Sequence, residues 1–122
     1  MIYLQYLLQI VAGIGIFNVW LLRFGQDTVY RGGNSSNMRE EFVVYGLPTV
    51  ALYIVGLLKI LSAIGLIAGI FLPLLIAPSA ILLAALMIGA LVMHFKIRDP
   101  FKKSIPALIM LTLCVAILLL AS

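Results

Sequence analysis

The chain has 122 residues, of which 65% are hydrophobic and 10% are charged, and its mean hydropathy is +1.26. This composition leaves too little polar surface to cover a water-soluble globule, so a soluble enzyme is excluded. The formal net charge of +4 comes mainly from residues between long apolar runs. That distribution indicates membrane topology and argues against nucleic acid as a partner. The single cysteine, Cys114, excludes an intrachain disulfide and a cysteine-based metal site.

Four apolar runs are long enough to cross a bilayer, at residues 2–22, 48–72, 78–95 and 105–121. A hydrocarbon core of about 30 Å needs roughly 17 to 25 helical residues, and no run alternates as a barrel strand does. Unpaired backbone groups are not tolerated in lipid, so each run is predicted to be a helix. We therefore expect an all-α fold, an integral membrane four-helix bundle, as a single transmembrane domain over residues 1–122. The first run lacks the basic start of a secretory signal and is expected to remain as a span.

Prolines are expected to mark the ends of these spans. Pro48 opens the second span, Pro73 and Pro78 bracket a tight turn before the third, and Pro100 follows its end. Pro48 is tolerable at its position because it falls in the first turn of a helix. Ser104 followed by Pro106 is expected to start the fourth span.

The basic residues predict the orientation of the bundle. Seven of the eight Lys and Arg residues lie in the connections 23–47 and 96–104, which share one side of a four-span protein. By the positive-inside rule both connections are cytoplasmic and both termini lie outside the cytoplasm, in a bacterial inner membrane. Aromatic anchors are expected at the outer interface (Tyr3, Tyr6) and at the inner one (Trp20, Phe24, Phe95).

The first polar connection is predicted to contain a short amphipathic helix between the first two spans. Asn37 followed by Glu40 resembles a capping box, and Met38, Phe42 and Tyr45 recur at helical spacing. We expect this helix to lie at the cytoplasmic interface.

Lys59 is the one charged residue inside a span. It lies eleven positions after Pro48, about 16 Å along the helix and near mid-depth, where lysine costs roughly 2.5–3.5 kcal/mol by insertion scales. Small neighbours such as Gly56 and Ala63, and the Gly65 to Gly69 step, favour close helix packing. Lys59 is therefore expected to point into the bundle, where no span supplies an acidic partner.

Two interpretations of Lys59 remain open. It either holds an anionic or quinone-like ligand or hydrogen-bonds Gln9 across the bundle to fix helix register, with Gln5 and Ser62 as further partners. At the cytoplasmic level Asn18, Arg23, His94 and Lys96 are expected to line a mouth leading to Lys59. The candidate ligand-binding residues are Lys59, Gln9, Ser62, Asn18 and His94. We expect no catalytic residues and no metal site, since a lone histidine cannot build one.

Several short stretches resemble the DoxX-like family of small membrane proteins. They are YRGGN at 30–34, MREEFVVYGLP at 38–48, VGLLK at 55–59, the glycine step at 65–69, MHF at 93–95 and DPFKK at 99–103. The resemblance implies a four-helix membrane bundle. It also implies an association with membrane redox complexes, because the family takes its name from a subunit of an archaeal thiosulfate:quinone oxidoreductase.

The preferred hypothesis is a membrane protein that presents Lys59 to a lipophilic, polar-headed molecule such as a quinone and supports a membrane redox partner. No haem, flavin or iron-sulfur ligands are evident, so catalysis by this chain alone is not expected. One alternative is a small transporter or channel for an anionic or lipophilic solute, formed by a homo-oligomer because four helices barely enclose a pathway. Another is a scaffold or assembly factor for a partner membrane protein.

Overall fold

Four long helices make up most of the chain. The computed structural model describes residues 2–22, 32–33 and 37–121. Its long helices are α1 (Ile2–Phe17), α3 (Thr49–Ala68), α4 (Ile76–Lys96) and α5 (Phe101–Ala121). Between them lie the π-helical segment η1 (Asn18–Leu22), the short helix α2 (Met38–Val44) and the 3₁₀ turn η2 (Pro73–Leu75). The described residues contain no strand, which confirms the all-α prediction.

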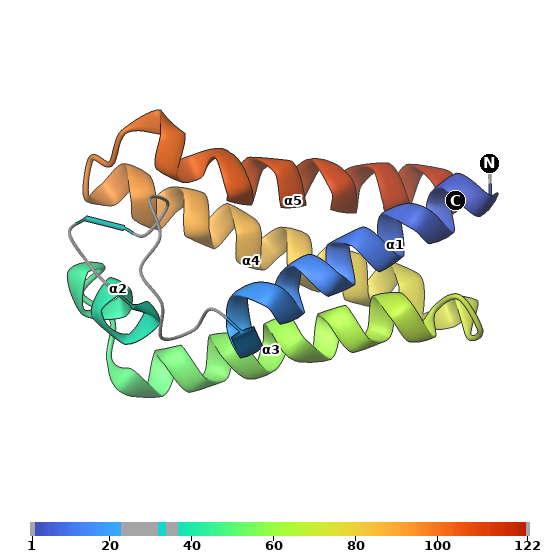
Figure 1. The fold of residues 1–122 in the computed structure, drawn as a ribbon, viewed down its shortest axis with the longest axis horizontal. Helices are drawn as coiled ribbons and strands as arrows, with labels where there is room; N and C mark the ends of the chain where they lie inside the picture. Colours follow the sequence, from blue (N-terminus) through green and yellow to red (C-terminus); the bar gives the residue numbers. More distant parts are fainter. Residues whose placement is uncertain (1, 23–31, 34–36, 122) are drawn as a thin grey trace.

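Successive long helices run in opposite directions (Figure 1). Each packs against two others, α1 and α4 both against α3 and α5, so the four form a ring. The two termini and the α3–α4 turn lie at one end of the bundle, and α2 and the turn at residues 97–100 lie at the other. We call this second end the polar end. As expected, the two polar connections share one side.

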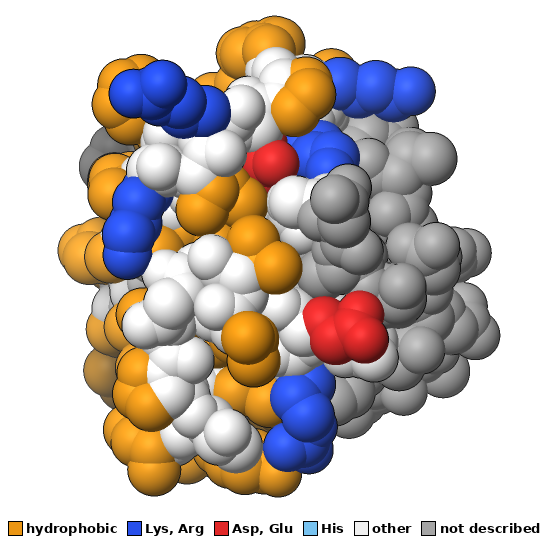
Figure 2. Space-filling model, turned by 90° about the vertical axis from the view of Figure 1, so that its left-hand side faces the viewer, with side chains coloured by type: hydrophobic (Ala, Val, Ile, Leu, Met, Phe, Trp, Pro, Cys, Tyr) orange, Lys and Arg blue, Asp and Glu red, His pale blue; other side chains and the backbone are white. Residues whose placement is uncertain are grey.

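The outer surface of the bundle suits a bilayer. Four helical stretches, Ile2–Trp20, Thr49–Ala68, Pro73–Lys96 and Phe101–Ala121, are long and apolar enough to cross a membrane. Large apolar side chains are exposed along all of them, for example Leu57 on α3 and Ile88 on α4. Lysine and arginine side chains surround the polar end, where acidic side chains are also visible (Figure 2). The chain is therefore an integral membrane protein with a separate polar end.

Glycines bring the helices close together, as the small residues predict. A side chain on Gly13 of α1 would lie 2.7 Å from Ile67 and 3.2 Å from the Ala63 carbonyl oxygen of α3. A side chain on Gly65 would collide with Ser79 of α4. These contacts show that both helix pairs depend on the absence of a Cβ atom, which is how membrane helices gain packing contact.

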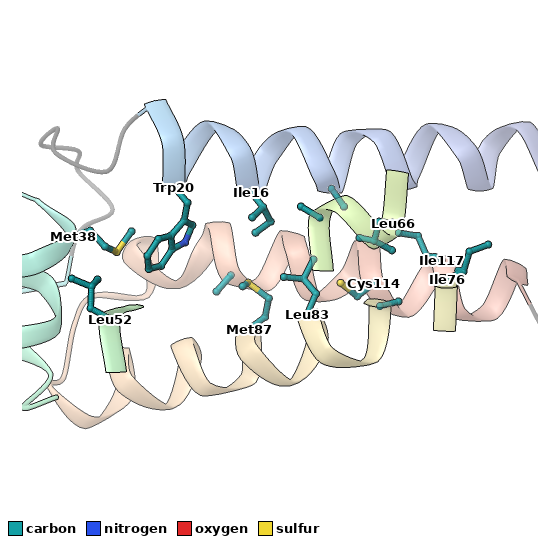
Figure 3. Packing of buried hydrophobic residues seen from close by; sticks show 14 of the residues in the cluster. Ile16, Trp20, Met38, Leu52, Leu66, Ile76, Leu83, Met87, Cys114 and Ile117 are labelled. Carbon is teal, nitrogen blue, oxygen red and sulfur yellow. The ribbon is translucent and has the colours of Figure 1, made fainter. Parts of the chain in front are cut away.

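The core follows the axis of the ring (Figure 3). Leu66, Leu83 and Ile117 have no exposed surface in the half near the termini, and Trp20 and Leu52 fill the half near α2. Gln9, a polar residue of α1, is also fully buried, in the half near the termini. Its amide donates to the Leu66 carbonyl oxygen at 2.6 Å and accepts a bond of 3.0 Å from the Gln5 amide, so its burial is compensated.

Helix boundaries differ from the predicted spans at two prolines and at the end of the second span. Pro78 lies inside the first turn of α4, which begins at Ile76, and therefore does not close the preceding turn. The expectation that Pro106 opens the last helix is wrong, because α5 begins at Phe101, directly after Pro100. Pro106 is the sixth residue of that helix, where its ring removes a single backbone bond, to the carbonyl of residue 102. The second span ends at Ala68 rather than 72.

The short helix α2 is present where the capping pattern predicts it. The Asn37 side chain accepts a 2.8 Å bond from the Glu40 backbone N–H, which caps the first turn. Met38, Phe42 and Tyr45 are all buried. The helix therefore packs its apolar face onto the end of the bundle, and its position there brings Tyr45 against α4.

Candidate ligand cavity

A cavity of about 710 Å³ lies among the helices and extends from the middle of the bundle to the polar end. Its walls come from α1, η1, α2, α3, α4 and α5, and most of the side chains that line it are apolar. Six residues place polar groups on it: Asn18, Glu41, Tyr45, Lys59, His94 and Lys103. A largely apolar cavity with a few polar groups is the usual form of a small-molecule site.

Lys59 lies at the inner end of this cavity, halfway along α3. Its Nζ atom is 5.0 Å from the centroid of the Trp20 ring, a cation–π contact. Among the described residues Lys59 has no hydrogen bond and no ion pair. The Glu41 carboxylate, on α2, is the acidic group whose charge acts on it. The acidic group that acts on Lys59 from a distance therefore lies outside the spans, which the sequence pattern did not indicate.

Trp20 forms the wall against which Lys59 rests. It is 7% exposed and meets Phe42 edge-on, with ring centroids 6.2 Å apart. A side chain on Gly56 would lie 2.7 Å from its ring, so the absence of a side chain there makes room for the indole. Figure 3 shows Trp20 pointing inward from the end of the first span. The prediction that Trp20 is an interfacial anchor is therefore wrong, because its side chain is part of the core.

The first span changes to a π-helix at Asn18, within the wall of the cavity. Wider π turns are often found at functional sites. Here Asn18, Val19 and Trp20 are consecutive and all three line the cavity. In a regular α-helix the side chains of three successive residues point in directions that span about 200°, so they would not be expected to face one cavity.

A row of polar contacts leads from the cavity to the polar end. The Tyr45 hydroxyl donates to Glu41 Oε1 at 2.7 Å and lies 3.4 Å from His94 Nε2. On the other side of the ring, His94 Nδ1 lies 2.7 Å from Asp99 Oδ2. Tyr45 and His94 are 4% and 6% exposed. Their contacts are thus shielded from solvent, where hydrogen bonds are strongest.

The turn after α4 places Asp99 against His94. The Asp99 N–H donates to the His94 carbonyl oxygen at 3.0 Å, and the Arg98 N–H donates to the Phe95 carbonyl oxygen at 3.0 Å. Arg98 itself has a φ of 58°. This is the bond pattern and the left-handed residue of a Schellman cap, which folds the chain back over the last helical turn. The cap therefore explains why an acidic side chain five residues along reaches the histidine ring.

Two lysines, Lys96 and Lys103, hold the segments of the polar end together. Lys96 Nζ donates to the Tyr45 carbonyl oxygen at 3.0 Å, which joins α4 to α2. Lys103 Nζ donates to the Gly33 carbonyl oxygen and lies 3.9 Å from Asp99 Oδ1. The Gly33 N–H donates to that same Asp99 oxygen at 3.0 Å. The connection between the first two spans is thereby attached to the turn between the last two.

Three of the five candidate ligand-binding residues line one cavity, namely Lys59, Asn18 and His94. The other two face other partners. Gln9 bonds Gln5 and the Leu66 carbonyl oxygen, and the Ser62 hydroxyl donates to the Leu58 carbonyl oxygen of its own helix at 2.8 Å. Of the residues expected at the mouth or the inner interface, Arg23 and Phe24 lie outside the described residues.

Glu41, Tyr45, Asp99 and Lys103 are the polar residues of this region that sequence reasoning did not select. The helical spacing of Met38, Phe42 and Tyr45 contained part of the signal, because it placed Tyr45 on the buried face of α2. Glu41 is four residues before Tyr45 and therefore lies one turn away, within bonding distance. The pairing of Asp99 with His94 depends on the left-handed turn at Arg98, which no sequence pattern predicted.

The fold and the cavity define a small helical membrane protein with a mostly apolar cavity that is partly open at the surface, and with a polar end. The described residues hold no group of three or more His, Cys, Asp or Glu side chains able to bind a metal ion. A family model described as the DoxX-like family matches residues 19–117, and the chain belongs to this family. Comparison with curated proteins and with solved structures gave no match.

Proposed function

We propose that the chain binds a lipophilic molecule with a polar head group, such as a quinone, in the cavity that leads to Lys59. The observation that carries the proposal is the cavity itself. Its volume of about 710 Å³ lies within the range of roughly 300–1,000 Å³ usual for small-molecule sites, and apolar side chains dominate its walls. Such walls favour a hydrophobic body, and the few polar groups favour one polar head.

Lys59 is the residue proposed to hold the head group. An ammonium group at this depth is unfavourable by roughly 2.5–3.5 kcal/mol on insertion scales. Among the described residues the Trp20 ring gives it a cation–π contact, and none gives it a hydrogen bond or an ion pair. A ligand oxygen beside Nζ would accept a hydrogen bond and offset that cost. The ring of Trp20, buried against Phe42, would form an aromatic wall for the body of the ligand.

The proposal also covers the membrane in which the protein lies and its orientation there. The polar end, with its lysines and arginines, is proposed to face the cytoplasm of a bacterial cell, with both termini on the outer side of the inner membrane. A quinone site would suit a subunit that supports a membrane redox complex. Co-migration of the chain with a haem-, flavin- or iron-sulfur-containing assembly on native gels of solubilised membranes tests that part.

Native mass spectrometry of the purified protein with its co-extracted lipids tests the binding proposal. Three proteins are compared: the wild type, Lys59→Met and the control Lys102→Met. Lys102 is exposed at the start of α5 and does not line the cavity, so the control removes an equal charge elsewhere. We expect a bound lipophilic species in the wild type and in the control, and its loss in Lys59→Met.

Two results would contradict the proposal. If all three proteins retain the same species in the same amount, Lys59 is not its binding residue. If all three are empty, and added decylubiquinone does not bind to the wild type, the cavity is not a quinone site. The latter outcome would favour a scaffold for a partner membrane protein.

A further inference from the structure

We infer that Tyr45 and His94 form a proton path from Glu41 in the cavity to Asp99 at the polar end, and that the cavity takes a lipophilic weak acid. The acid would bind as its anion beside Lys59 while its proton moves to His94. This inference rests on the proposed binding function and specifies the chemistry of the head group.

The path is a continuous series of heavy-atom contacts. Glu41 Oε1 accepts from the Tyr45 hydroxyl at 2.7 Å, and that hydroxyl is 3.4 Å from His94 Nε2. His94 Nδ1 is 2.7 Å from Asp99 Oδ2. Glu41, Tyr45 and His94 all line the cavity, whereas Asp99 belongs to the turn beyond α4. The series therefore joins the ligand space to the polar end without a gap.

Each member can pass a proton to the next. A carboxylate accepts a proton, a phenol hydroxyl both donates and accepts, and imidazole carries a proton on either nitrogen. Histidine is also the side chain whose charge changes most readily near neutral pH. With Nδ1–H directed at Asp99, the Nε2 lone pair faces the Tyr45 hydroxyl and is the site that takes up the proton.

The transfer balances without any redox partner. The ligand O–H bond breaks and its proton binds a Glu41 oxygen, while the Tyr45 hydroxyl turns from Glu41 to His94. The Glu41 proton then moves to the Tyr45 oxygen as the Tyr45 proton moves to His94 Nε2. Glu41 is again a carboxylate and Tyr45 is again a phenol. The net change is one ligand anion and one imidazolium.

The surrounding charges suit this end state. The new ligand anion would lie beside the Lys59 ammonium of α3, and the new imidazolium would lie 2.7 Å from the Asp99 carboxylate. Lys103 of α5 is 3.9 Å from the other Asp99 oxygen, and Lys96 of α4 bonds the Tyr45 backbone. The ligand anion thus has the Lys59 ammonium as its opposite charge, against the restored Glu41 carboxylate that also lines the cavity, and the imidazolium has Asp99.

A chromophoric weak acid tests the inference, namely 4-dodecyl-2-nitrophenol, whose phenol and phenolate absorb at different wavelengths. Its methyl ether has the same body but no acidic proton. Both probes are titrated into the full-length protein in detergent micelles, and the pH at which half of the bound phenol is ionised is measured. The same probe in protein-free micelles supplies the reference value.

In the wild type we expect that midpoint to fall by about 1 pH unit or more below the reference, the usual effect of an opposite charge nearby. Tyr45→Phe keeps the aromatic packing but removes the hydroxyl that relays the proton, so after a pH jump its bound phenol should ionise about tenfold or more slowly than in the wild type. The control Tyr53→Phe removes a hydroxyl from an exposed residue of α3 that contacts Arg39 outside the cavity. Its ionisation rate and its midpoint should both equal those of the wild type.

The methyl ether separates the proton path from a packing effect. Its affinity should differ by less than about twofold between the wild type and Tyr45→Phe, since it has no proton to give. His94→Gln removes the imidazole that accepts the proton, and this variant should bring the midpoint back towards the reference. It therefore serves if Tyr45→Phe does not fold.

The failures are distinguishable. If phenol and ether bind equally well and the wild-type midpoint stays at the reference, the proton path is overturned while the cavity remains a binding site. An unchanged ionisation rate in Tyr45→Phe, together with an unchanged low midpoint in His94→Gln, also overturns the path. If neither probe binds the wild type, the proposed function fails and the inference fails with it.

Discussion

The Lys59 ammonium lies 5.0 Å from the ring centroid of Trp20, in the middle of a helical membrane bundle. The contact joins the centre of α3 to the π-helical end of the first span, and Gly56 provides the space for the indole. A cation–π contact is worth roughly 0.5–2 kcal/mol, less than the unfavourable free energy of placing lysine at mid-depth. Lys59 is therefore held in place at a net loss of stability.

Replacing Lys59 by Met should stabilise the empty protein. Methionine has a similar length and no charge, so the burial cost disappears together with the weaker cation–π contact. We expect the free energy of unfolding to rise by about 1 kcal/mol, measured by thermal unfolding in detergent without ligand. Lys102→Met at the exposed start of α5 should have no effect. A lower stability of Lys59→Met would show that the lysine has a structural partner.

Adding one methyl group at Gly56 should destabilise the bundle. A Cβ atom there would lie 2.7 Å from the Trp20 ring, which is packed against Phe42 and has little room to move. Overpacking of this kind costs about 1–3 kcal/mol. The matched control is Gly89→Ala on α4, where a Cβ atom meets nothing within 4 Å. Equal thermal unfolding temperatures for the two variants would contradict the packing described.

Gln9→Leu should weaken the contact between α1 and α3 without affecting ligand binding. The variant removes the bond to the Leu66 carbonyl oxygen and the bond from Gln5, far from the cavity wall. Hydrogen bonds between membrane helices average about 0.6 kcal/mol and reach about 1.7 kcal/mol. We expect a loss of about 1 kcal/mol in stability and unchanged probe affinity.

The control for Gln9→Leu is Thr112→Val on α5. Thr112 is exposed and bonds only the Leu108 carbonyl oxygen of its own helix in the described structure, so its loss should be close to neutral. A marked loss of probe affinity in Gln9→Leu would show that Gln9 is a ligand-binding residue after all.

Arg98→Gly should stabilise the turn between α4 and α5. Arg98 has a φ of 58°, a left-handed conformation that is unfavourable by roughly 1–2 kcal/mol for a residue with a Cβ atom and open to glycine. Part of the gain is offset because glycine is freer in the unfolded chain. We expect a net rise of about 0.5–1 kcal/mol in the free energy of unfolding. Arg98→Ala removes the charge but keeps the strain, and should show no such rise.

Thiol labelling tests the proposed orientation. In a Cys114→Ala background, Lys102→Cys places a thiol at the polar end and Tyr3→Cys places one near the N-terminus; both positions are exposed. An impermeant reagent added to intact cells with a permeable outer membrane should label Tyr3→Cys and should label Lys102→Cys only after lysis. The reverse pattern would invert the topology.

Features that depend on residues close together in the chain were predictable from the sequence. Features that depend on contacts between distant segments were not. The four helices followed from run length and hydropathy, and α2 followed from its cap and apolar spacing. Lys59 was identified because it is a charge within a span. These features each depend on residues that are close together in the chain.

The candidate site is harder to predict because its members meet across the fold. Gln9 and Lys59 are both polar and both within spans, yet Gln9 faces Leu66 and Lys59 faces Trp20. Depth in the membrane, which sequence gives, does not tell which way a helix is rotated. Likewise, Trp20 looked like an anchor by its position at a span end, and the π-helical turn directs it inward.

The π-helical segment gives this bundle a sensitivity to chain length that substitutions do not reveal. A π turn is equivalent to one extra residue within an α-helix, so deleting Val19 would allow regular α-helical hydrogen bonding to continue through the end of the span. Trp20 would then directly follow Asn18, one helical step earlier than now, and its side chain would leave the helix in a different direction. Trp20 would leave Lys59 although no side chain in their contact had been replaced. The spacing of the first span, counted in residues, is thus as much a determinant of the cavity as the identity of the residues that line it.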